Sequence, residues 1–219
     1  MNFIVRVIVL SFICTGFASA QNVGFTFGGN NSVIKGGDDR LGTLHHYLGF
    51  NGGIAAFFPF LSSRSGEAFT KLFFLYSYEG FLVTNDKSGF LRKLGVKENA
   101  ANDSYGYSHG DRDYAVISHN LKLPVLLGYH FYFSEYGLGP YFGGFARRQF
   151  KSNLDESNIS YDHFSYGLSS GLSFDVSNMF QITAGFEWDV NTEKSEWPFA
   201  KSRNAFFNIS YLFSTSTMR

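Results

Sequence analysis

The feature that most constrains the fold of this chain is the strict alternation of residue types in FQITAGFEWDV, residues 180–190. Every second residue is apolar, and each residue between is polar or glycine. A period of two puts successive side chains on opposite faces, so the stretch predicts a β-strand with one apolar and one polar face. In a water-soluble protein the apolar face would form the core, whereas in a membrane barrel it would meet lipid. Fold and function both depend on which face points inward.

Seven other segments also have strand character, and neither a sustained helical period nor a linker interrupts the series. Several segments reach ten residues, which matches a tilted membrane crossing of about 9–11 residues better than the average globular strand of about 5–6. Pro124 predicts a β-bulge in the fourth segment, since proline cannot donate to a strand ladder. The eight expected strands cover about residues 22–28, 44–58, 71–83, 114–133, 137–150, 161–176, 180–190 and 205–213.

The connections between these segments alternate in length. The long, mostly polar ones cover about residues 35–43, 84–113, 151–160 and 191–204. The shorter ones cover about residues 59–70, 134–136 and 177–178, of which 59–70 is a partial exception. Alternating long and short connections along an even number of antiparallel strands are typical of outer-membrane barrels, whose short turns lie in the periplasm. We therefore expect an all-β fold, a transmembrane eight-stranded antiparallel up-and-down β-barrel, with both termini on the periplasmic side.

The chain begins with MNFIVRVIVLSFICTGFASA, which has a positive start, a short apolar stretch and small residues before a cleavage point. This pattern predicts a secretory signal peptide over residues 1–20, cleaved after Ala20, followed by an outer-membrane β-barrel domain over residues 21–219. The one cysteine, Cys14, lies in the predicted leader, so a disulfide framework is not expected in the exported part.

Composition narrows the class of protein further. Removal of Arg6 with the leader leaves 17 Lys and Arg against 18 Asp and Glu, which gives no electrostatic case for binding nucleic acid. After the leader, no stretch approaches the roughly 18 apolar residues of a spanning helix. Yet 19% of residues are aromatic, including 27 Phe and 13 Tyr. Such a load suits a lipid-facing barrel with aromatic girdles.

The make-up of the polar faces favours turning them inward. These faces carry mostly Gly, Ser, Thr, Asn and Gln, while most lysines fall in the expected loops. Small polar side chains suit the narrow interior of an eight-stranded barrel, which side chains are just able to fill. Charges buried there would have to be paired. We therefore predict a salt-bridge network in the lumen, with Arg148 as the alternative to Arg147. The predicted members are Glu79, Lys122, Arg147, Glu187 and Asp189.

Two consecutive stretches resemble a known family. LKLPVLLGYHFYF (residues 121–133) followed by GLGPYFGGFARR (residues 137–148) looks like the fourth and fifth strands of the porin-like, PorT-type outer-membrane β-barrel family. The resemblance covers about residues 23–213 and implies an eight-stranded barrel in a Gram-negative outer membrane. It implies little about activity; some members assist protein secretion, but no residue here carries that role over. Phe213 is followed by six more residues, a departure from outer-membrane chains that end on an aromatic.

Catalytic and metal chemistry are weakly supported. His163 and Ser165 have the His-x-Ser spacing of barrel-embedded lipid A deacylases, and Asp175 or Glu187 would be the orienting carboxylate. However, this pair belongs to the face expected to point into the lumen rather than toward lipid. The six histidines are scattered, and adjacent His45 and His46 face opposite sides of a strand. We therefore predict no catalytic, cofactor or metal site.

The resulting functional hypothesis is a non-enzymatic integral outer-membrane protein with a side-chain-filled lumen. It would act as a membrane anchor that contacts outer-membrane lipid and lipopolysaccharide, with a possible protein partner through residues 84–113. The first alternative is a narrow channel for ions or small solutes, although eight strands enclose far less space than the 16–18 strands of porins. A barrel-embedded lipid A-modifying hydrolase and a soluble periplasmic β-sandwich are less favoured.

Overall fold

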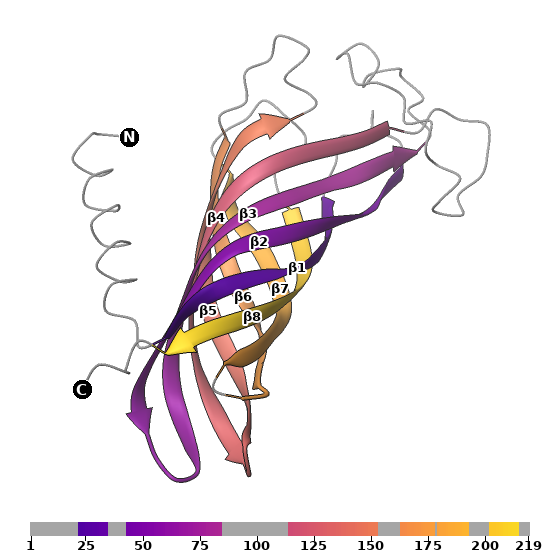
Figure 1. Ribbon diagram of the computed structural model, residues 1–219. Helices are drawn as coiled ribbons and strands as arrows, with labels where there is room; N and C mark the ends of the chain where they lie inside the picture. Colours follow the sequence, from indigo (N-terminus) through magenta and orange to yellow (C-terminus); the bar gives the residue numbers. More distant parts are fainter. Residues whose placement is uncertain are drawn as a thin grey trace.

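The computed structural model describes residues 22–34, 43–84, 114–152, 163–177, 179–192 and 202–214, which form eight β-strands (Figure 1). No helix in these ranges is long and apolar enough to cross a membrane. The strands are β1 (Asn22–Ile34), β2 (Thr43–Ser62), β3 (Gly66–Thr84), β4 (Tyr114–Phe133), β5 (Tyr136–Ser152), β6 (His163–Asp175), β7 (Phe180–Thr192) and β8 (Ser202–Ser214).

Each strand pairs antiparallel with its neighbour in sequence, and β8 pairs with β1 to close the barrel. The expected eight-stranded up-and-down topology is therefore confirmed. The short connections lie together at one end, where Asn22 and Ser214 also pair (Figure 1). We call this the turn end. The opposite loop end is where the strands lead into residues 35–42, 85–113, 153–162 and 193–201, which lie outside the described ranges.

Two expectations about local structure were wrong. Residues 59–70 are mostly strand, because β2 and β3 continue to a tight turn at 63–65, where the Ser63 amide donates to the Gly66 carbonyl over 2.8 Å. The irregularity falls between Pro59 and Leu61, where the pairing with β3 shifts. Pro124 marks no bulge: it pairs with Phe145, and the β3–β4 register is the same on either side of it. A missing donor thus costs a ladder bond without inserting a residue.

The alternation that defines β7 points its polar face inward. Thr183 is 0% exposed in the lumen, whereas Phe186 on the other face is 58% exposed. Gln181, Glu187 and Asp189 are buried with Thr183, while Phe180 and Val190 are exposed with Phe186. The outer surface is thus the apolar one, as in a protein whose solvent is lipid.

The outer surface is apolar in its middle, and clusters of aromatic rings lie toward both of its ends. Along β4 the outward side chains run from His119 through Leu121, Val125 and Leu127 to Phe131. Toward the loop end, ring contacts join β2–β5 in what we call the loop-side aromatic cluster: Tyr47, Phe50, Tyr76, Tyr78, His119 and Phe150. A turn-side set includes Phe25, Tyr129, Phe131, Tyr136, Phe174, Phe180, Tyr211 and Phe213. An apolar band between two aromatic girdles identifies a transmembrane barrel.

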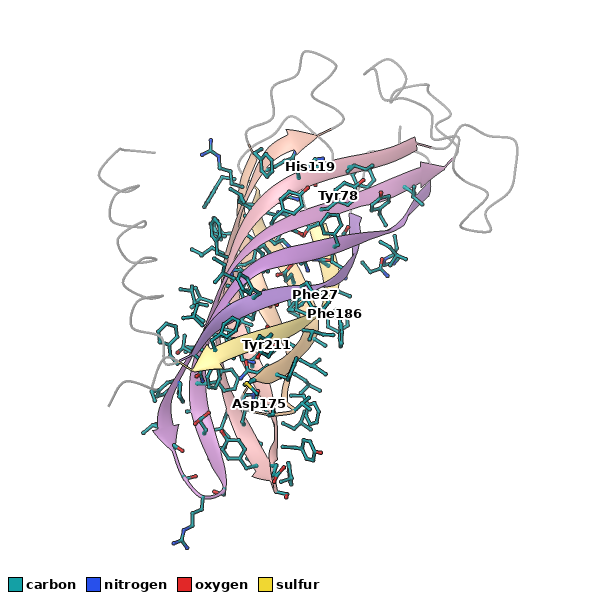
Figure 2. The ribbon with its side chains drawn as sticks, viewed as in Figure 1. Phe27, Tyr78, His119, Asp175, Phe186 and Tyr211 are labelled. Carbon is teal, nitrogen blue, oxygen red and sulfur yellow. The ribbon has the colours of Figure 1, made fainter. Side chains whose placement is uncertain are left out.

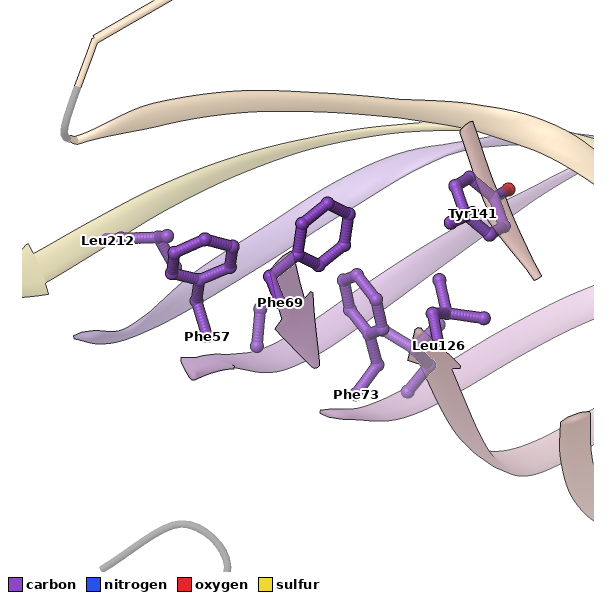
Figure 3. Packing of buried hydrophobic residues seen from close by; sticks show 8 residues of the cluster. Phe57, Phe69, Phe73, Leu126, Tyr141 and Leu212 are labelled. Carbon is purple, nitrogen blue, oxygen red and sulfur yellow. The ribbon is translucent and has the colours of Figure 1, made fainter. Parts of the chain in front are cut away.

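The lumen is packed with side chains, and its turn-end half contains an apolar cluster (Figure 3). Phe69 is fully buried there, and Phe57 and Leu126 are nearly so. The cluster draws on β2, β3, β4, β5 and β8: Ala55, Phe57, Phe69, Phe73, Leu75, Leu126, Tyr141 and Leu212. Apolar residues therefore point inward as well as outward on β3 and β5.

Glycines on β6 and β7 make room for one member of this apolar cluster. The Tyr141 hydroxyl donates to the Ala184 carbonyl over 3.2 Å. A Cβ atom at Gly185 would lie 2.1 Å from that hydroxyl, and one at Gly171 would lie 2.5 Å from it. Gly171 is the cross-strand partner of Tyr141 and Gly185 that of Gly171, so the tyrosine side chain lies along the inner wall over both glycines. Backbone oxygens of Ala184 and Ser170 crowd the same two positions.

Candidate functional site

The loop-end half of the lumen holds the five residues predicted to form a charge network. Glu79 comes from β3, Lys122 from β4 and Arg147 from β5, while Glu187 and Asp189 come from β7 on the opposite wall. Lys122 and Arg147 are direct cross-strand partners. Each lies on an inward position of its strand, so closing the barrel brings the two cations between carboxylates of facing walls.

Ion pairs link all five residues in one chain. The Lys122 Nζ lies 2.6 Å from Glu187 Oε2 and also pairs with Glu79 Oε1. The second Glu79 oxygen accepts from Arg147 Nη1 over 2.9 Å, and Arg147 Nη2 reaches Asp189 Oδ2 at 2.5 Å. The order is therefore Glu187, Lys122, Glu79, Arg147, Asp189, with a carboxylate at each end.

Neutral side chains extend this network toward β1, β6 and β8. Asn204 Nδ2 donates to Glu187 Oε2 over 3.0 Å, and Arg147 Nε donates to Ser165 Oγ over 3.0 Å. The Ser77 hydroxyl lies 2.6 Å from Glu79 Oε1 and 2.6 Å from Asn51 Oδ1. Hydrogen bonds between side-chain amides extend the network further: Asn30 Nδ2 donates to Asn51 Oδ1, and Asn51 Nδ2 donates to Asn208 Oδ1.

Burial makes the pairing a requirement. Lys122 is 2% exposed, and Glu79 and Glu187 are also buried. Moving one unpaired charge into such a place costs several kcal/mol, even after relaxation. Two cations facing three carboxylates leave one formal negative charge in the network. The arrangement can therefore act as a rigid cross-brace between β3–β5 and β7.

The choice between the two arginines is settled by their faces. Arg147 points into the lumen and pairs there, whereas Arg148 is exposed on the outer surface. The sequence of β5 is ambiguous because aromatic residues lie on both of its faces: Tyr141 and Phe145 are inside, and Phe142 and Phe150 are outside.

One buried cation was missed from the sequence. Lys71 on β3 is 2% exposed and donates to Ser173 Oγ at 2.5 Å and Thr183 Oγ1 at 3.5 Å. Its Nζ also lies 5.2 Å from the centre of the Phe69 ring. The sequence did contain a signal: Lys71 and Glu79 are eight positions apart on β3, so their side chains lie on the same face of the strand.

A second pair lies near the turn end, where His130 Nδ1 is 2.8 Å from Asp175 Oδ2. The His130 ring stacks on Phe69 with centroids 4.1 Å apart and is fully buried. Both residues are buried on the inward faces of their strands, and nothing in the sequence predicts that they pair.

Among the residues considered for lipid hydrolysis, Ser165 and Glu187 have partners in the ion-pair network. Ser165 is buried and accepts a hydrogen bond from Arg147, while Glu187 is occupied by Lys122. Asp175 ends β6 whereas His163 begins it, so they lie at opposite ends of the barrel. The side chain of His163 is outside the described part. Within that part, no group of His, Cys, Asp and Glu is placed to hold a metal ion.

The predicted leader, residues 1–20, and nearly all of the predicted partner loop 84–113 lie outside the described ranges. The cleavage after Ala20 and the loop partner therefore stay predictions.

Comparisons with known proteins find likeness in structure only. No family model matches the chain, and no curated protein matches it. The PorT-type resemblance accordingly stays a prediction. Similar solved structures include Ail, the attachment invasion locus protein of Yersinia pestis, in complex with the heparin analogue sucrose octasulfate, at 14% identity and a TM-score of 0.39. That match covers 88% of this chain and 98% of the other. Ail in a phospholipid bilayer nanodisc matches at 16% identity and a TM-score of 0.35, over 88% and 99%.

Proposed function

We propose that this chain is a non-enzymatic integral outer-membrane β-barrel that anchors its loop-end segments at the cell surface and does not form an open pore. The observation that carries the proposal is the ion-pair chain across the lumen, in which Lys122 and Arg147 bridge Glu79 to the β7 carboxylates. A solute passing through would have to separate these buried pairs, and each broken pair leaves a costly uncompensated charge.

The apolar half of the lumen supports the same function. Phe57, Phe69, Phe73 and Leu126 fill the turn end below the ion pairs. An eight-stranded barrel has just enough interior space for such side chains. The lumen is therefore filled by ion pairs toward the loop end and by apolar side chains toward the turn end, as expected of a rigid membrane anchor.

The leader would be removed after Ala20, and the barrel would lie in a Gram-negative outer membrane as the PorT-type resemblance implies. Its partners would be outer-membrane lipid and lipopolysaccharide, with a protein contact through residues 84–113 as a further possibility. The Ser165 hydroxyl, which accepts from Arg147, would serve the brace and not a hydrolytic reaction.

A narrow channel is the second candidate, and one observation favours it. The inner faces of β6 and β7 are polar or glycine from end to end, with Ser169, Ser173 and Thr183 between the two charged regions. A single file of water molecules hydrogen-bonded along this polar face would allow ions or small solutes to pass.

Two measurements test the proposal. Cell fractionation with gel mobility of boiled and unboiled samples should place the protein in the outer membrane with a heat-dependent shift. Recovery in the soluble periplasm without a shift would overturn it.

Planar-bilayer recording of the purified barrel distinguishes anchor from channel. We expect a closed baseline for the wild type and also for Arg147→Ala, because the apolar side chains still fill the turn end of the lumen. Steady nanosiemens-scale openings of the wild type would establish the channel instead.

A further inference from the structure

The outer surface of the barrel has an uneven charge distribution. Among the outward strand side chains that the structure describes, the formally charged ones are Arg148 on β5 and Arg203 on β8, both exposed. Both lie toward the loop end, and described outward strand positions include no carboxylate. A cation on a lipid-facing surface is expensive at mid-membrane and is tolerated near the interface, where headgroup phosphates are available.

Arg148 differs from Arg203 in its surroundings. On its own face of β5 the next outward residue is Phe150, and its cross-strand partner is Leu121, next to outward His119 on β4. His119 and Phe150 have ring centres 6.1 Å apart and belong to the loop-side aromatic cluster. Arg203 pairs with Trp188 and Val33, away from that cluster.

The loop-side aromatic cluster has a polar side. Tyr76 Oη lies 2.6 Å from His119 Nδ1, and Tyr47 Oη lies 3.2 Å from Tyr78 Oη. Figure 2 shows Tyr78 and His119 together high on the wall, toward the loop end. Phe50 and Tyr78 stack at 5.3 Å, so ring faces and hydroxyls form one continuous surface over β2–β5. Amphipathic rings of this kind lie at the level of lipid headgroups.

We propose that Arg148 and the loop-side aromatic cluster form a lateral binding site for a phosphorylated glycolipid of the outer leaflet. The guanidinium would donate to the lipid phosphate, an arrangement in which its planar fork makes two bonds. The neighbouring hydroxyls and imidazole would donate to sugar oxygens, and the rings would support the sugar and the first acyl carbons. The inference rests on the proposed outer-membrane location, because that location puts the loop end in the leaflet that carries phosphorylated sugars.

A glycolipid fits this site better than a simple phospholipid does. A glycerophosphate headgroup needs a cation alone, which Arg203 would offer equally. The cluster adds a wide surface with hydroxyl and imidazole groups from three strands, β2, β3 and β4. A sugar headgroup can use both these hydrogen-bonding groups and the ring faces, whereas a glycerophosphate cannot.

The test is native mass spectrometry of the full barrel refolded in vesicles and then released into detergent. Vesicles contain phosphatidylethanolamine plus a minor share of lipid A, dephosphorylated lipid A or phosphatidylglycerol. We expect lipid A to stay bound to the wild type, and Arg148→Gln to lower its occupancy by roughly tenfold or more, as for loss of a charge-assisted hydrogen bond. Arg203→Gln, the matched outward cation, should leave occupancy unchanged.

Three results would overturn the site: no retained lipid A on the wild type, equal retention of dephosphorylated lipid A, or equal loss in both arginine variants. Equal retention of phosphatidylglycerol would overturn the assignment to a glycolipid. Tyr76→Phe with His119→Phe keeps the rings and should lower lipid A retention without altering that of phosphatidylglycerol. The heat-dependent gel mobility of the wild type and of every variant is checked as a control for insertion. A wild-type barrel that inserts but retains no lipid A would refute this site alone. Failure of the wild type to insert would refute the proposed function.

Discussion

The two halves of the lumen are stabilised in different ways. The loop-end half contains Lys122 and Arg147 among carboxylates, each buried group held by an opposite charge. The turn-end half is mostly hydrocarbon around Phe69 and Leu126, with Lys71 bonded to hydroxyls and His130 paired with Asp175 near the turn end. Removing one partner from an ion pair leaves a buried charge, whereas trimming an apolar side chain leaves only a gap. We therefore expect substitutions that remove one charged side chain to be most costly near the loop end, where each charge depends on its opposite.

The largest effect is expected for Lys122→Met. It leaves Glu79 and Glu187 without their shared cation, which should destabilise the barrel by about 3–5 kcal/mol. Urea unfolding in detergent micelles, followed by tryptophan fluorescence, measures the change. Adding Glu187→Gln should recover part of the loss. If Lys122→Met unfolds like the wild type, the charged half is not a brace.

A lysine placed on the outer face tests whether that face of the barrel contacts lipid. Phe186→Lys puts a charge on the exposed lipid face and should cost roughly 2–4 kcal/mol near the midplane. Insertion into vesicles, scored by heat-dependent mobility, should fall. Arg203→Lys keeps an existing outward cation and serves as the control. Normal assembly of Phe186→Lys would argue that the outer face was assigned wrongly.

In the apolar half, Gly185→Ala tests packing without charge. Its Cβ would lie 2.1 Å from the Tyr141 hydroxyl, and overpacking of this kind costs about 1–3 kcal/mol. The same unfolding assay should show a smaller loss in a Tyr141→Phe background, where the hydroxyl is absent. An equal loss in both backgrounds would mean that backbone crowding, and not the tyrosine, requires glycine here.

The smallest effect is expected for Lys71→Met, which sharpens the comparison. Among the described residues, no carboxylate forms an ion pair with the Lys71 ammonium, so the change breaks no ion pair and adds apolar contact with Phe57 and Phe69. Stability should change by less than about 1 kcal/mol, since replacing buried polar groups with apolar ones of similar shape is often neutral. A loss as large as that of Lys122→Met would show that both halves depend on charge.

Much of this architecture follows from residue order alone. β4 was predicted with its observed bounds, and the period of two in β7 correctly separates its buried Thr183 from its exposed Phe186. The prediction was poorer where both faces are apolar. On β3 and β5, inward Phe69, Phe73 and Tyr141 break the polar pattern, which is why the start of β3 was missed and the faces of β5 stayed ambiguous.

Alternation along one strand assigns a side chain to a face, because successive Cβ atoms point to opposite sides. Alternation is therefore enough to identify the strands and to assign Glu79, Lys122 and Glu187 to the inward face. It does not say which of them meet. Lys122 reaches Glu187 and Lys71 reaches Thr183 because closure sets β7 opposite β3 and β4, with strand tilt and shear determining the level of each residue. Those distances exist only once the barrel is closed.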